Sequence, residues 1–206
     1  MTVKAPEEGN IWEWRVFGDV SPELMSTLQS LPVRNGLVDH PDEDIYLISP
    51  VSDQNVKLRK IEGRWVLKFK ELLEKAADSI ELYYESQARI FDLPVTGEVL
   101  TSAATLLGAV LPSFPSHSGY DRDQIIRIFG GASPRVSVID VPKIRTQFMV
   151  DGGWVELAGV RFSRRTIQTV SIHSSDKKVV ERTLQSFGPD AHLEVLNYID
   201  ACRRWG

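Results

Sequence analysis

The sequence predicts an α+β protein built around an antiparallel sheet, and two observations carry this prediction. Segments in which apolar and charged residues alternate come in pairs joined by short turns, which is typical of β-hairpins and not of strand–helix–strand units. These segments fall into two groups, at about residues 10–95 and 133–175, with helical segments between and after them. We therefore expect residues 1–206 to form a single domain.

The first group of predicted strands begins at residues 10–17, where Trp12 and Trp14 alternate with charged residues. Ser21 and Pro22 then form a helix-start signal, and apolar residues at helical spacing extend this helix to about residue 30. Three further strands are expected at 42–50, 55–60 and 64–70, and the last two form a hairpin. Residues 71–77 are expected to be helical, and residues 79–91 fit either a strand or a helix.

The second half of the chain repeats this order. An apolar helix is expected from Thr96 to Leu111 and an amphipathic helix at 121–129, closed by two glycines. The second group of strands is expected at 135–141, 143–150, 154–162 and 167–173. A helix that starts at Ser175 or Asp176 and a final helix over residues 189–203 complete the predicted order.

Composition limits the classes of function. The chain has 24 lysines and arginines against 28 acidic residues, and this mildly acidic total argues against a duplex-DNA or other nucleic-acid partner. No apolar run reaches the ~18 residues of a membrane span, and the N-terminus lacks the apolar core of a signal peptide. The single cysteine, Cys202, excludes an internal disulfide and a cysteine-based metal cluster. We expect a cytoplasmic protein without a membrane partner.

Charged residues on four of the predicted strands follow each other at every second position. Successive residues of a strand point to opposite faces, so each pair shares one face. The pairs are Glu13 with Arg15, Lys57 with Arg59, Lys68 with Lys70, and Lys143 with Arg145. A solvated sheet face also alternates, but it mixes signs because like charges on neighbouring strands repel. A face so rich in cations needs either an anionic ligand or carboxylates supplied from elsewhere in the chain, and a triphosphate is the natural candidate for the ligand.

The order and spacing of these segments resemble the CYTH superfamily, or triphosphate tunnel metalloenzymes, which includes thiamine triphosphatases and class IV adenylate cyclases. The matching segments are WEWRVF (12–17), DIYL (44–47), NVKLRK (55–60), GRWVLKFK (63–70), VPKIRTQF (141–148), GGWVELAGV (152–160), TVSIHSSD (169–176) and the C-terminal LNYIDAC. The resemblance covers nearly the whole chain. It implies an antiparallel, eight-stranded closed barrel, or tunnel, with inward-facing charges and flanking helices.

The resemblance also implies roles for individual residues. Seven basic residues would bind phosphate: Arg15, Lys57, Arg59, Lys68, Lys70, Lys143 and Arg145. Glu13 and Glu156 would remain as ligands for Mg²⁺ or Mn²⁺, which prefer carboxylate oxygens.

The chain departs from the family pattern at its carboxylates. Ile11 stands where the family has the first Glu of its opening motif, and Ser171 and His173 stand where it has a later carboxylate pair. We therefore expect a phosphate-binding site with a degraded metal centre, and we assign no catalytic residue. His173 fits a metal ligand, an added cation or an ordinary polar residue.

Three functions stay open. The first is a tunnel that binds a polyanionic phosphate compound (a triphosphate, nucleotide or polyphosphate), with or without hydrolysing it as a divergent triphosphatase. The second is a non-catalytic interaction or ligand-binding module on the inherited fold, with the tunnel collapsed or filled by side chains. The third is a metal-independent enzyme acting on a phosphorylated small molecule.

The sequence predicts a phosphorylated small molecule as the partner and leaves a homodimer open. No P-loop, dinucleotide fingerprint or serine-nucleophile elbow is present.

Overall fold

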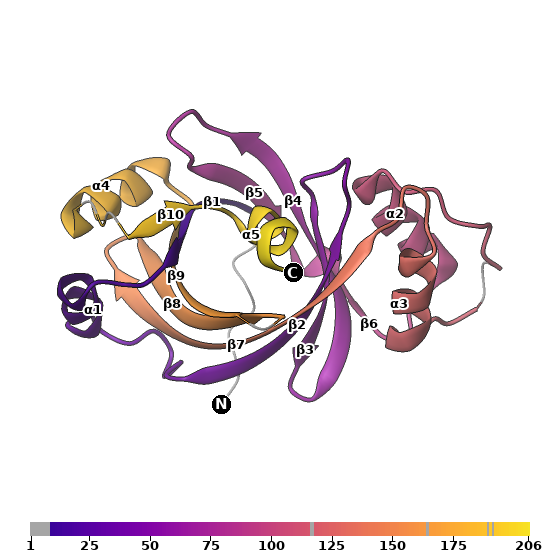
Figure 1. The fold of residues 1–206 in the computed structure, drawn as a ribbon, viewed down its shortest axis with the longest axis horizontal. Helices are drawn as coiled ribbons and strands as arrows, with labels where there is room; N and C mark the ends of the chain where they lie inside the picture. The colour runs from indigo at the N-terminus through magenta and orange to yellow at the C-terminus, as the bar shows by residue number, and fades with distance from the viewer. Residues whose placement is uncertain (1–8, 116–117, 164, 189, 191) are drawn as a thin grey trace.

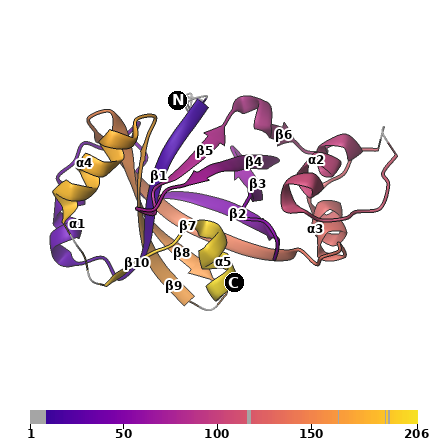
Figure 2. The same cartoon turned by 90° about the horizontal axis from the view of Figure 1, so that it is seen from above.

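An antiparallel sheet that closes on itself forms the body of the protein (Figure 1, Figure 2). The computed structural model describes residues 9–115, 118–163, 165–188, 190 and 192–206. The barrel strands are β1 (Gly9–Gly18), β2 (His40–Ile48), β3 (Asn55–Ile61), β4 (Arg64–Lys75), β5 (Glu81–Glu85), β7 (Ser137–Val150), β8 (Gly153–Phe162) and β9 (Arg165–Ser174). Around the barrel they follow the order β1, β5, β4, β3, β2, β7, β8, β9, and β9 pairs back with β1. The predicted eight-stranded closed barrel is confirmed.

The remaining elements flank the barrel. They are α1 (Pro22–Gln29), the short 3₁₀ helix η1 (Gln87–Arg89), β6 (Ile90–Asp92), α2 (Gly97–Leu107), α3 (Arg122–Gly130), α4 (Lys177–Phe187), β10 (Leu193–Val195) and α5 (Tyr198–Trp205). In Figure 1, α2 and α3 lie on one side of the barrel and α1 and α4 on the other. None of the helices in the described part of the chain is long and apolar enough to cross a membrane.

Because successive residues of a strand point to opposite faces, the apolar side chains point outward and pack against these helices. The outer faces of β2, β3 and β4 pack against α2 and α3, with Leu47, Leu58 and Phe69 among the buried residues. On the other side, the outer faces of β1 and β9 pack against α1 and α4. The predicted start of α1 is confirmed, because the Ser21 side chain accepts a hydrogen bond from the Leu24 amide. The other face of each strand, which carries the charged residues, therefore lines the lumen.

The C-terminal helix α5 closes one end of the lumen. Figure 1 shows α5 within the outline of the barrel strands. At that end the inward positions become apolar, and Phe17, Val160 and Phe162 form one buried cluster with Ile199 and Cys202 of α5. The lumen thus has an apolar end filled by α5 and a charged middle.

Three of the predicted elements are wrong. Residues 71–75 extend β4 instead of forming a helix, because their backbone pairs with β5. The last helix begins at Tyr198, since residues 193–195 form β10 against the free edge of β1; Pro189, its predicted start, lies outside the described residues. The two strands predicted on either side of Pro142 form one strand, β7, because β2 pairs with it without a break from Ser137 to Arg145. The ambiguous segment 79–91 contains β5, η1 and the start of β6.

The apolar end of the lumen gives the first prediction. Ile199→Ala is expected to lower the free energy of unfolding by about 2–5 kcal/mol, because Ile199 is 1% exposed and its removal leaves a cavity. Ile144→Ala is the matched control, because Ile144 is 56% exposed on β7, and it should cost no more than about 1 kcal/mol. Urea unfolding measures both. Equal losses for the two variants would contradict the packing of α5 into the barrel.

Candidate functional site

All seven predicted phosphate-binding side chains meet in the barrel lumen, together with five carboxylates. We call this group the lumen cluster: Arg15, Lys57, Arg59, Lys68, Lys70, Lys143 and Arg145 with Glu13, Asp42, Asp44, Glu85 and Glu156. The most exposed of these side chains, that of Arg145, is only 16% exposed. Each of the seven cations lies within 4.0 Å of a carboxylate oxygen of the cluster. Their role in binding phosphate stays a prediction.

Asp44 holds three of the cations. Strand β2 lies between β3 and β7, so Asp44 faces cations from both neighbours. Its carboxylate lies 3.0 Å from Lys57 Nζ and 3.1 Å from Lys143 Nζ, and it accepts two hydrogen bonds from Arg59 at 2.7 and 2.9 Å. Burial alone would raise the pKa of Asp44, but these three cations hold it well below its usual value. Asp44 therefore stays ionised.

Glu85 performs the same task on the opposite wall. Its carboxylate lies 2.7 Å from Lys68 Nζ and 3.1 Å from Lys70 Nζ. Burial opposes ionisation here too, yet the two lysines hold the pKa of Glu85 well below its usual range. Lys70 also contacts Glu13, so this group continues into the wall formed by β1.

Arg15 lies between the two carboxylates that the sequence suggested as metal ligands. Its Nε donates to Glu13 Oε1 at 2.7 Å, and its Nη2 lies 3.8 Å from Glu156 Oε1. Its Nη1 donates to Thr169 Oγ1 at 3.3 Å, and the guanidinium sits 4.4 Å from the ring centroid of Tyr198. Burial is the largest single influence and lowers the pKa of Arg15, but the Glu13 carboxylate together with Tyr198 and Glu156 raises the pKa above its ordinary value. The guanidinium is thus a fixed positive charge.

Three lysines of the lumen cluster have lowered pKa values despite their carboxylate partners. Burial is the largest cause for Lys57, Lys68 and Lys143, and the charge of nearby Arg59 lowers all three further. Carboxylates in the cluster raise the pKa of each lysine but do not restore it. Burial and neighbouring cations therefore disfavour the charged forms of these three lysines, and the internal carboxylates offset this only in part.

Solved structures with the same architecture match the chain over nearly its full length. A conserved hypothetical protein from Pyrococcus furiosus is 15% identical with a TM-score of 0.53, and the match covers 91% of this chain and 98% of that one. A putative adenylate cyclase from Bacillus halodurans is 14% identical with a TM-score of 0.52, covering 94% and 98%. A putative adenylyl cyclase from Hippeastrum, described as having a dominant triphosphatase activity, is 13% identical with a TM-score of 0.52, covering 94% and 95%.

The chain has a CYTH-type tunnel fold. The fold resemblance seen in the sequence is confirmed by these matches. No protein-family model matches the sequence, and no curated protein matches it. The similarity between this chain and the solved structures is therefore a similarity of fold.

The residues of this tunnel do not fit a divalent metal ion. Both oxygens of Glu13 are engaged, Oε1 by Arg15 and Oε2 by Lys70. Oε2 of Glu156 accepts hydrogen bonds from Arg145 at 3.0 Å and from Gln147 at 2.9 Å. Within the described ranges, no group of three or more acidic, histidine or cysteine side chains is placed to hold a metal. Mg²⁺ would have to displace bound cations from both predicted ligands.

His173 is a neutral member of the tunnel wall. Its ring stacks on Trp154 with centroids 4.9 Å apart, and its Nε2 lies 2.8 Å from Ser171 Oγ. Burial lowers the pKa of His173 to about 4, and the nearby cations add to this effect against the Glu13 carboxylate. At neutral pH it therefore adds no cation to the lumen.

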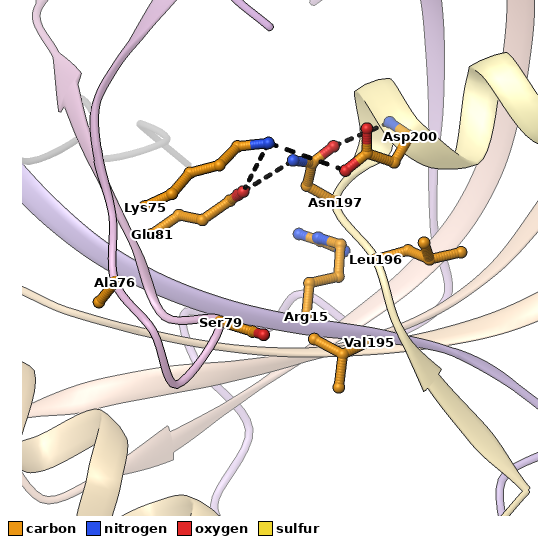
Figure 3. A pocket seen from close by; sticks show the side chains of 9 residues that line it. All are labelled: Arg15, Lys75, Ala76, Ser79, Glu81, Val195, Leu196, Asn197 and Asp200. Atoms are coloured by element: carbon orange, nitrogen blue, oxygen red, sulfur yellow. Dashed lines mark hydrogen bonds and ion pairs between the residues drawn. The ribbon is translucent and has the colours of Figure 1, made fainter.

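A cavity of about 180 Å³ opens beside the tunnel at Arg15 (Figure 3). β5 pairs with β1 only as far as Glu13, and β10 pairs with β1 from Val16 onward, so the wall is interrupted between them. The cavity lies in this gap, between the β4–β5 hairpin and the segment that leads into α5. Lys75 bridges it, with Nζ 3.7 Å from Glu81 and 3.9 Å from Asp200.

Sequence reasoning missed three carboxylates and one aromatic residue of the site: Asp42, Asp44, Glu85 and Tyr198. Asp42 and Asp44 stand at every second position of β2, which is the same signal that identified the basic pairs. Glu85 lies in the segment that fitted either a strand or a helix. Tyr198 comes from α5, and no strand periodicity could have placed it in the lumen.

Asp44 gives the second prediction. Asp44→Asn is expected to lower the free energy of unfolding by about 3–5 kcal/mol, because it leaves three buried cations without their shared carboxylate. Glu43→Gln is the matched control on the same strand, since the Glu43–Lys60 pair is largely exposed and worth at most about 1 kcal/mol. Chemical unfolding measures the loss in free energy of unfolding for both variants. A loss for Asp44→Asn no larger than that of the control would refute the role of Asp44.

The lowered pKa values of Asp44 and Glu85 give the third prediction. Both carboxylates titrate lower in the folded protein than in the unfolded chain, so their stabilisation is complete above about pH 4 and is lost as pH falls toward the folded-state values. The free energy of unfolding should therefore drop steeply below about pH 4. Glu85→Gln removes one titrating group and should flatten that slope in a pH series of urea unfolding. A wild-type profile with no acid slope would be incompatible with these ion pairs.

Proposed function

We propose that the protein binds a compact polyanionic phosphate compound, such as a triphosphate or short polyphosphate, in the lumen of its tunnel. The observation that carries this proposal is the imbalance of the lumen cluster, in which seven cations face five carboxylates. A phosphate chain supplies several negative charges on closely spaced oxygens, and arginine and lysine are the side chains best suited to bind them.

Burial makes this imbalance costly without an anion. An unpaired buried charge costs several kcal/mol, roughly, because the protein interior solvates ions poorly. The lowered pKa values of Lys57 and Lys143 report this cost directly, since burial and neighbouring cations both disfavour their charged forms. An anionic ligand would stabilise the charged forms of these lysines, which supports a polyanion bound in the lumen.

The distribution of the cations favours an extended anion over a single phosphate. They come from β1, β3, β4 and β7, and therefore from several walls of the barrel. The dominant triphosphatase activity of the Hippeastrum protein with the same fold supports a ligand of the triphosphate class.

The proposal is one of binding and includes no metal-assisted hydrolysis. Glu13 and Glu156, the two predicted metal ligands, are engaged by cations of the protein itself. No step that needs Mg²⁺ or Mn²⁺ follows from this arrangement.

A second candidate is a non-catalytic interaction module whose lumen stays closed. The observation that favours it is that each cation of the lumen cluster already has a carboxylate partner and that α5 fills one end of the lumen. The two candidates differ in one property: only the first exchanges these internal partners for a soluble anion.

Isothermal titration with tripolyphosphate separates the two and gives the fourth prediction. The wild type is expected to bind, and Lys143→Met should weaken binding by about 10- to 100-fold, because one charged hydrogen bond contributes about 1.5–3 kcal/mol. Asp44 keeps Lys57 and Arg59 as partners in this variant, so the fold should persist.

Lys60→Met is the matched control, because Lys60 pairs with Glu43 on the outer face of β3 and its side chain is 38% exposed. Its affinity for tripolyphosphate should equal that of the wild type. Absence of heat with the wild type, or equal weakening by both substitutions, would favour the closed module and refute binding in the lumen.

A further inference from the structure

We propose that Arg15 is a built-in replacement for a divalent cation, so that the tunnel binds its polyanion without metal. The first half of this inference concerns the protein alone, and the second half rests on the proposed function. Glu13 and Glu156, the two predicted metal ligands, are contacted by cations of the protein itself.

The guanidinium of Arg15 lies between Glu13 and Glu156, the two predicted metal ligands, and contacts both. It donates to Glu13 at 2.7 Å through Nε and approaches Glu156 to 3.8 Å through Nη2. These contacts join β1 to β8, two strands that are not neighbours in the barrel. One positive group therefore links the same two carboxylates that the sequence assigned to Mg²⁺ or Mn²⁺.

Other cations complete the enclosure of these carboxylates. Glu13 Oε2 contacts Lys70, and Glu156 Oε2 accepts from Arg145 at 3.0 Å. Each of the four carboxylate oxygens thus has a positively charged neighbour within 4.0 Å. A divalent ion could bridge the two carboxylates only if Arg15 left its place between them, which would strand buried charges.

An arginine suits this position better than a lysine would. Its planar group presents several donors in fixed directions and stays charged under burial, whereas Lys57 and Lys143 in this lumen have lowered pKa values. Arg15 is further held by Thr169 at 3.3 Å and by the ring of Tyr198. The guanidinium is therefore fixed in place before any ligand arrives.

Arg15 also lines the 180 Å³ cavity in the gap between β5 and β10 (Figure 3). Lys75 lines the same cavity and pairs with the carboxylates of Glu81 and Asp200, so Arg15 is left to contact a phosphate oxygen that enters from that side. Arg15 therefore serves both to neutralise Glu13 and Glu156 and to face the ligand.

Counting bound Mn²⁺ by electron paramagnetic resonance tests the role of Arg15 without any phosphate ligand. The quantity measured is the Mn²⁺ bound by a protein minus that bound by the same protein carrying Glu13→Gln. For the wild type this difference is expected to be zero. For Arg15→Gln, which frees Glu13 Oε1 and Glu156 Oε1, it is expected to be one equivalent. Circular dichroism checks that each variant is folded, and the wild-type comparison needs no Arg15 variant.

One equivalent of Glu13-dependent Mn²⁺ in the wild type would overturn the inference. A folded Arg15→Gln variant that gains none would also overturn it.

Titration of tripolyphosphate in EDTA and in Mg²⁺ tests the second half. Affinity in EDTA is expected to equal or exceed that in Mg²⁺, whereas binding about tenfold tighter in Mg²⁺ would overturn metal-free binding and leave the proposed function intact. Absence of binding in both buffers would refute the proposed function and metal-free binding together, while the Mn²⁺ count decides the role of Arg15 independently.

Discussion

The tunnel depends on carboxylates that keep seven cations buried in one lumen. Isolated buried ions are strongly disfavoured, so each lysine or arginine that points inward needs a partner in the same interior. Asp44 supplies one for Lys57, Arg59 and Lys143, and Glu85 supplies one for Lys68 and Lys70. Because these carboxylates come from other strands than their cations, the ion pairs also join the walls of the barrel to one another.

Closure of the sheet into a barrel places these cations and carboxylates in one lumen. In an open sheet the charged face of each strand would be exposed to water, and the alternation of apolar and charged residues would not by itself indicate a binding site. When β9 pairs with β1, every inward position faces the same interior, and outward positions meet the flanking helices. Under the proposed function, internal carboxylates and an external polyanion compete for one set of cations in the lumen, and the excess of cations over carboxylates favours the external anion.

The sequence predicted the architecture because its strongest signals are local. Alternation at every second position needs only a few neighbouring residues, and it located the strands that carry Arg15, Lys57 and Lys143. It failed where pairing partners decide the structure: residues 71–75 are strand because β5 lies beside them, and β10 exists because β1 has a free edge. The same limit applies to the site. Each cation could be identified alone, but whether Glu13 binds a metal or Arg15 depends on side chains far along the chain, such as Lys70 and Glu156.

A crystal structure grown with tripolyphosphate and EDTA tests the exchange of partners most directly. We expect ordered phosphate groups in the lumen, contacting Lys57, Lys68 and Lys143, with at least one carboxylate of the lumen cluster displaced from its cation. Phosphate bound only on the outer surface, with Asp44 and Glu85 still holding their lysines, would contradict binding in the tunnel.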